Sequence, residues 1–189
     1  MQKFYSLLIL IVLIQLTAFG QKPEDTEVWE PEPTIIEPGY SYASAPSDAI
    51  VLFSENHLDQ WTNKDGQDAP WIVEGDHFTV KPGSGGIQTI EKFTDFQLHI
   101  EWMPPTVIQG EGQGRGNSGI FMQGLYELQV LDSYNNRTYS NGQAASIYKQ
   151  QIPLVNAMHG TGVWNSYDVI YTAPRFRTNG ELESPGYVT

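Results

Sequence analysis

The first pattern along the chain is an apolar run near its beginning. Phe4–Leu16 is almost entirely apolar and follows the single basic residue Lys3. Small residues at Ala18 and Gly20 come next, at the spacing that a signal peptidase reads. The run is shorter than the roughly 20 residues that a membrane-spanning helix needs. We therefore predict a signal peptide over residues 1–20, no membrane span after its cleavage, and a protein that lies in the periplasm or outside the cell.

The next segment differs in composition. Residues 21–47 hold five prolines, and residues 21–48 hold seven acidic side chains against one lysine. Proline withholds backbone donors and like charges repel, so this composition favours an extended tether. We predict an acidic, Pro-rich linker over residues 21–47 and a folded domain over residues 48–189.

From residue 48 onward, short apolar runs and two-residue alternation replace helical periodicity. Ile50–Phe53 is a β-branched apolar run that indicates a buried strand. In Phe96–Trp102 apolar and polar residues alternate, so His99 and Glu101 share the face opposite to the apolar one. Further strands are predicted at Trp71–Val73, His77–Val80, Ile120–Met122, Tyr126–Leu131 and Trp164–Thr172. Short strands separated by turns predict an all-β sandwich or barrel.

The last ten residues indicate a turn followed by the opening of a strand at Tyr187–Thr189. Nothing in the sequence caps that strand. This pattern predicts an incomplete sandwich that lacks its closing strands and leaves a sheet edge unpaired.

Composition narrows the chemistry. The absence of cysteine removes disulfides, a thiolate nucleophile and Cys-based metal sites. The net charge of −12 predicts that the surface repels nucleic acid, whereas a neutral sugar is compatible with it.

The glycines of Gly114–Gly119 satisfy a dinucleotide-binding pattern, but that pattern must follow a strand and open a helix. Here it follows a glycine-rich loop and opens a predicted strand. The segment therefore favours a mobile loop at the rim of a site over a nucleotide cradle.

Candidate chemistry concentrates in the strand Tyr126–Leu131. If Leu128 and Val130 face the core, Glu127 and Gln129 point together to the opposite face. On a flat sheet these would be ordinary solvated side chains, as would Glu101. In a concave groove, carboxylates and amides bind sugar hydroxyls or act as acid and base.

Two other candidate site residues, Tyr148 and Lys149, each allow two interpretations. Tyr148 belongs to a group of tyrosines suited either to stacking on sugar rings or to core packing, and Lys149 is either a functional cation or a surface residue. The spacing of acidic and imidazole side chains indicates no metal centre. Asp132 with Asn135–Asn136 offers only a weak contact for a divalent cation.

Three stretches of the chain resemble the 3-keto-disaccharide hydrolase family. They are Phe96–Trp102, Gly114–Phe121 together with Tyr126–Ser133, and Trp164–Tyr171, and the resemblance runs from about residue 48 to residue 189. It implies a concanavalin A-like jelly roll of two antiparallel sheets with a concave sugar-binding face.

The resemblance also implies a reaction. The family acts on glycosides oxidised at sugar C3, where the ketone acidifies C2–H and permits elimination at C1 followed by hydration. On this basis we expect Glu101 and Glu127 to be catalytic, and Asn117, Gln129, Arg115, Tyr148 and Lys149 to bind substrate, with Lys149 or a divalent cation stabilising the enolate. A sugar 3-dehydrogenase would supply the oxidised substrate.

Two alternatives remain open at this point. A lectin-like module would use the same fold and groove without breaking a bond. An ordinary glycosidase would use two carboxylates on an unoxidised glycoside.

Overall fold

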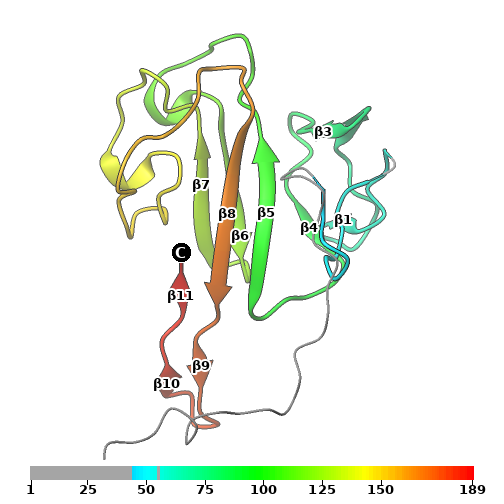
Figure 1. Ribbon diagram of the computed structural model, residues 1–189, viewed down its shortest axis with the longest axis vertical. Coiled ribbons are helices and arrows are strands. Elements are labelled where there is room, and N and C mark those ends of the chain that lie inside the picture. Colours follow the sequence, from blue (N-terminus) through cyan, green and yellow to red (C-terminus); the bar gives the residue numbers. More distant parts are fainter. Residues whose placement is uncertain (1–43, 55) are drawn as a thin grey trace, which may run out of the picture. The chain divides into compact units, whose positions relative to one another are not determined.

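The computed structural model describes residues 44–54 and 56–189 (Figure 1). The chain divides into two units, Met1–Glu55 and Asn56–Thr189. The predicted signal peptide and most of the predicted linker lie outside the described residues. In the described part of the chain, no helix has the length and apolar character needed to cross a membrane.

The predicted buried strand over Ile50–Phe53 is wrong. These residues form no strand, and the side chains of Ile50 and Val51 are about half exposed, at 53% and 48%. Apolar length and β-branching favour an extended conformation, but a strand also needs a neighbour for its backbone hydrogen bonds. None of the described sheets includes this segment.

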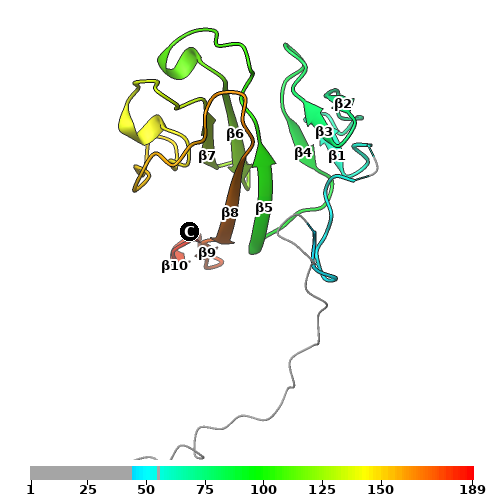
Figure 2. The same ribbon diagram turned by 45° about the horizontal axis from the view of Figure 1, so that its top comes forward.

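The second unit is built from antiparallel strand pairs. Strands β5 (Phe96–Trp102), β8 (Asn165–Thr172) and β11 (Tyr187–Val188) form one sheet in the order β11-β8-β5. Strands β6 (Asn117–Met122) and β7 (Tyr126–Leu131) form a hairpin, and β5 and β8 lie in front of it in Figure 2.

The remaining elements are shorter. The pairs are β1 (Trp61–Asn63) with β4 (Ile87–Thr89), β2 (Ile72–Glu74) with β3 (His77–Thr79), and β9 (Arg175–Phe176) with β10 (Leu182–Ser184). Two 3-10 turns, η2 (Gly112–Gly114) and η3 (Ser140–Gly142), lie in the loops around β6 and β7.

The core lies between the β5–β8 sheet and the β6–β7 hairpin. Met122 and Leu128 from the hairpin pack against Val169 and Tyr171 from β8. Along β5 the burial alternates residue by residue, as the sequence predicted. Each layer therefore turns one face to the core and the other outward, and the predicted all-β, jelly-roll-like sandwich of antiparallel sheets is confirmed.

Residues 144–148 cover the free edge of β7. The Gln129 N–H donates to Ser146 O at 3.0 Å, and the Ala145 N–H donates to Gln129 O at 3.0 Å. Two residues thus face one, which makes a β-bulge with Ala145 at φ +66°. Because β7 has neighbours on both edges, its outward side chains are sheltered although they point away from the core.

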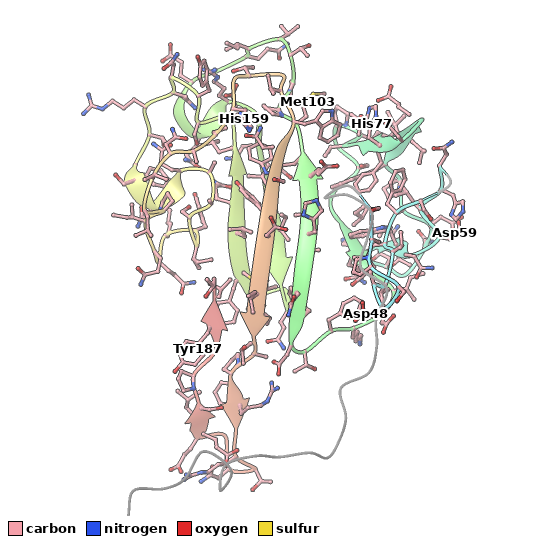
Figure 3. All side chains as sticks on the ribbon, in the orientation of Figure 1. Asp48, Asp59, His77, Met103, His159 and Tyr187 are labelled. Carbon is pink, nitrogen blue, oxygen red and sulfur yellow. The ribbon has the colours of Figure 1, made fainter. Side chains whose placement is uncertain are left out.

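The glycine-rich loop before β6 is anchored by side chains. Asn136 Nδ2 donates to Gly112 O at 2.9 Å, and Gln113 Nε2 donates to Gly142 O at 2.8 Å. A strand and not a helix follows the loop, as the sequence predicted, but β6 begins at Asn117, three residues before the predicted start at Ile120. Asn117–Gly119 therefore belong to a paired strand and not to a mobile loop. Two further loops reach the same end of the sandwich, where Met103 follows β5 and His159 precedes β8 (Figure 3).

We predict that Leu131→Ala lowers the free energy of unfolding by about 2–5 kcal/mol, because the Leu131 side chain is fully buried and its removal leaves a cavity. Denaturant unfolding followed by tryptophan fluorescence measures the change. Leu125→Ala is the matched control, since Leu125 is 72% exposed, and it should stay within about 0.5 kcal/mol of the unmodified protein. Equal effects from the two substitutions would contradict the buried position of Leu131, which lies on the same face of β7 as Glu127 and Gln129 and is covered there.

Candidate functional site

Glu127 lies on the outward face of the β6–β7 hairpin. It pairs across the strands with Phe121, and Gly119 is its diagonal neighbour on the same face. A Cβ atom at Gly119 would overlap the Glu127 carboxylate, so glycine at this position lets the side chain lie flat over β6. Partial burial raises the pKa of the Glu127 carboxyl above its ordinary value. A carboxylate held in this way suits proton abstraction.

Three amide side chains, those of Gln113, Asn117 and Gln129, form a hydrogen-bonded group on the same side of the hairpin as Glu127. Gln129 Nε2 donates to Gln113 Oε1 at 3.0 Å, and Asn117 Nδ2 donates to Gln113 O at 2.8 Å. Gln129 is almost fully buried, and its Oε1 atom accepts no hydrogen bond from the described residues. Of the two predicted substrate-binding amides, Asn117 is exposed on this face, whereas Gln129 supports Gln113 from below.

Two tyrosines and a lysine complete the cluster. The hydroxyls of Tyr139 and Tyr148 are hydrogen-bonded to each other, and their ring centroids are 6.1 Å apart. Lys149 Nζ lies 5.4 Å from the Tyr139 ring centroid and 5.7 Å from that of Tyr148, within cation–π range. We call Glu127, Gln129, Tyr139, Tyr148 and Lys149 the β7 cluster.

Electrostatics tie Tyr139 to its neighbours. Its hydrogen bond with Tyr148 raises the pKa of Tyr139 to about 12, and the charge of Glu127 acts in the same direction. A Cβ atom at Gly142 would overlap the Tyr139 ring. Gly142 therefore plays the same part for Tyr139 that Gly119 plays for Glu127.

The backbone beside Tyr148 is strained. Ala145 and Lys149 both adopt positive φ, +66° and +59°, a region that costs a residue with a side chain about 1–3 kcal/mol. The Lys149 N–H donates to Asn141 O at 2.7 Å, and the Tyr148 N–H donates to Glu127 O at 2.9 Å. Two such residues within five positions favour a functional role for this segment.

The structure does not bring Glu101 and Glu127, the two residues expected to be catalytic, onto one face of the sandwich. Glu101 is exposed on the outer side of the β5–β8 layer, opposite Ser166. Beside it, His99 Nδ1 lies 2.7 Å from Asp168 Oδ1. The core separates this face from the β7 cluster, because each layer turns its other face inward. Alternation within a strand identifies an outward face but not which layer carries it.

Arg115 also lies apart from the cluster. Its side chain is nearly buried, where Nε donates to Asp132 Oδ2 at 2.8 Å and Nη2 donates to Thr161 Oγ1 at 2.8 Å. Arg115 and Asp132 line a pocket of about 490 Å³ with Gly114, Gly116 and the loop residues 105–109. Their pairing makes Arg115 an anchor between loops.

The cation contact considered at Asp132 does not fit the structure. The Asp132 carboxylate accepts hydrogen bonds from Arg115, Thr161 and the Tyr134 N–H, so its oxygens are already occupied. Asn136 uses its amide on Gly112 O and Asp132 O. Within residues 44–54 and 56–189, no group of three or more acidic or histidine side chains could hold a metal ion.

Sequence reasoning missed Tyr139 and Gln113. Tyr139 belongs to the group of tyrosines suited either to stacking on sugar rings or to core packing and was not singled out, and Gln113 was not considered within the glycine-rich loop. Both lie in irregular segments without a periodic pattern. Both side chains lie against Gly142, and this loop geometry brings Tyr139 toward Glu127 and Gln113 onto Gln129, which no spacing in the sequence indicates.

The sequence is similar to a known protein family and to a solved structure. A family model described as a 3-keto-alpha-glucoside-1,2-lyase-like domain matches residues 48–184. A crystal structure from Parabacteroides distasonis ATCC 8503, described as a "putative glycosyl hydrolase", is 53% identical in sequence with a TM-score of 0.84. The match covers 90% of this chain and 74% of that chain. No curated protein matches the sequence.

We predict that Ala145→Gly raises the free energy of unfolding by about 1 kcal/mol, because glycine adopts positive φ without strain. Chemical denaturation measures the change. The matched control is Ala144→Gly, whose buried methyl group lies at a residue without positive φ. That control should lose about 0.5–1 kcal/mol. Destabilisation by Ala145→Gly would contradict the strained bulge.

Proposed function

This chain belongs to the 3-keto-alpha-glucoside-1,2-lyase-like family, and from that premise we propose that it cleaves glycosides carrying a ketone at sugar C3, by elimination followed by hydration. The family and the structural neighbour support a glycoside hydrolase-type function. The observation that carries the finer proposal is the β7 cluster. It contains a sheltered carboxylate whose charge acts on Tyr139, a pair of hydrogen-bonded phenols, and an ammonium group over the two phenol rings.

The chemistry follows from the ketone. A carbonyl at C3 acidifies C2–H, and Glu127 as a carboxylate takes that proton while an enolate forms at the C3 oxygen. When the C3 carbonyl reforms, C1=C2 is made and the C1–oxygen bond to the departing sugar breaks. Water then adds to C1, and the Glu127 carboxylic acid returns a proton to C2. The net change is hydrolysis of one glycosidic bond.

Lys149 is suited to the negative charge that develops on the enolate oxygen. Its ammonium is exposed next to the two tyrosines, and its positive φ fixes the backbone from which the side chain extends. A fixed positive charge stabilises an oxyanion in the transition state more than it stabilises the neutral ketone.

The proposal has consequences outside the molecule. A substrate with a C3 ketone requires an oxidoreductase that makes it, so a sugar 3-dehydrogenase is the expected upstream partner. The apolar run over residues 4–16 supports export, which would place the reaction in the periplasm or outside the cell.

An ordinary two-carboxylate glycosidase built on Glu101 and Glu127 is not favoured. Such enzymes hold two carboxyl groups on either side of one glycosidic bond, roughly 5–10 Å apart. Glu101 and Glu127 instead lie on the outer faces of two different layers.

We predict that Glu127→Gln lowers kcat/KM for a 3-keto-disaccharide by about 10²–10⁴-fold, because the amide cannot accept the C2 proton. Chromatography of the released monosaccharide measures the rate. Glu101→Gln is the matched control and should retain activity within about twofold, since Glu101 lies on the other layer. Full activity in Glu127→Gln would contradict the assignment of the base.

The pH profile gives a separate prediction. Glu127 must be ionised to act as a base, and burial raises the pKa of its carboxyl above 4.5. As pH falls through that raised pKa, Glu127 binds a proton and kcat/KM for the 3-keto substrate should fall about tenfold per pH unit. Initial rates measured from pH 4 to pH 8 would show this acidic limb at a higher pH than an ordinary exposed glutamate would give. A flat profile through this range would contradict a titrating base.

A further inference from the structure

The departing sugar also needs a proton, and Glu101 is not placed to give it. When the C1–oxygen bond breaks, an alkoxide leaves unless an acid protonates it. Glu101 was the expected donor, but it lies on the outer face of the other layer. The charge of Glu127 acts on Tyr139, whose hydroxyl is hydrogen-bonded to that of Tyr148.

The two hydroxyls are built into the cluster. Tyr148 is the last residue of the segment 144–148 that pairs with β7, and its N–H donates to Glu127 O at 2.9 Å. Tyr139 comes from the far side of the same loop, and its ring crosses Gly142 where a side chain would block it. Gln113 and Gln129 both donate to Gly142 O, at 2.8 Å and 3.4 Å, which fixes that crossing point.

We propose that Tyr139 and Tyr148 act as the acid that protonates the departing glycosidic oxygen, a role that rests on the proposed function. Tyrosine is among the side chains that serve as general acids. The pair offers one hydroxyl that donates to its partner and one whose proton is free to move outward.

The protons balance over one catalytic cycle. One tyrosine hydroxyl gives its proton to the leaving oxygen as C1–O breaks, which releases the departing sugar as an alcohol and leaves a phenolate. The phenolate removes a proton from the water that adds to C1. Glu127 returns its proton to C2, so both residues end in their starting forms with one water consumed.

Lys149 is placed to stabilise the phenolate that forms when a tyrosine gives up its proton. Its ammonium lies over both rings at 5.4 Å and 5.7 Å, so it stabilises negative charge on either tyrosine. The hydrogen bond between the tyrosines raises the pKa of Tyr139 to about 12, which keeps that hydroxyl protonated before reaction at neutral pH. The cluster thus starts each cycle with a proton to give.

The test compares two leaving groups. Tyr139→Phe and Tyr148→Phe keep the rings and remove one hydroxyl each. With a 3-keto-disaccharide, whose leaving alkoxide is strongly basic, at least one variant should lose about 10²–10⁴-fold in kcat/KM. With a 4-nitrophenyl 3-keto-glucoside, whose leaving group departs without a proton, the same variant should stay within about threefold of the unmodified protein.

Two control variants distinguish the tyrosine acid from the proposed elimination reaction as a whole. Glu127→Gln should lose activity on both substrates, because both need C2–H removed. Tyr134→Phe alters a tyrosine outside the β7 cluster and should leave both rates unchanged. Thermal unfolding followed by circular dichroism shows which variants fold, and either folded tyrosine variant is sufficient for the comparison.

Two results would overturn the tyrosine acid while leaving the elimination proposal standing. One is full activity of both variants on the disaccharide. The other is an equal loss on the two substrates, which would indicate a structural role. If the unmodified protein cleaved neither 3-keto substrate, the proposed function itself would fail.

Discussion

The contact between the apolar faces of the two strand layers determines where every candidate group lies. Met122 and Leu128 pack on Val169 and Tyr171, and this contact forces the alternate residues of each strand outward. On β7 the outward residues include Glu127 and Gln129, whereas on β5 they include His99 and Glu101. The same packing that buries the core therefore separates the two glutamates.

Outward does not mean exposed in this molecule. Residues 144–148 hydrogen-bond along β7, and the loop between β7 and β8 carries Tyr139, Tyr148 and Lys149 over the hairpin. Gly119 and Gly142 leave room for the carboxylate and the phenol ring to lie flat. The result is a partly desolvated carboxylate whose charge acts on Tyr139, while the Lys149 ammonium lies over the two tyrosine rings. Such surroundings tune acid–base groups. The strained bulge at Ala145 belongs to this covering segment.

Much of the fold follows from local pattern. The alternation in Phe96–Trp102 and the apolar runs around Gln123–Leu125 predict β5, β6 and β7 because a buried strand face imposes a period of two. The run Ile50–Phe53 misleads, since the same pattern carries no information about a hydrogen-bonding partner. The pattern thus predicts the strands that pair within a sheet but does not show whether a given apolar segment joins one.

The site is only partly predictable. Glu127 follows from strand parity, and Tyr148 and Lys149 stand close in sequence to the segment that pairs with β7. The separation of Glu101 from Glu127 depends on which strands pair into which layer. The alternation of side chains along a single strand does not contain this information. The role of Arg115 was also not predictable from the sequence. Its charge indicated a substrate-binding residue, whereas in the structure it forms a buried ion pair with Asp132. The place of Tyr139 depends on the course of an irregular loop.

The most direct test of the account is to incubate the full chain with a 3-keto-disaccharide and, separately, with its unoxidised parent, and to quantify monosaccharide release from each. The account predicts release from the keto substrate alone, because only the ketone makes C2–H acidic enough for Glu127 to remove. Release from the unoxidised parent would contradict elimination chemistry. Binding of either sugar without release from the keto substrate would instead identify a carbohydrate-binding module.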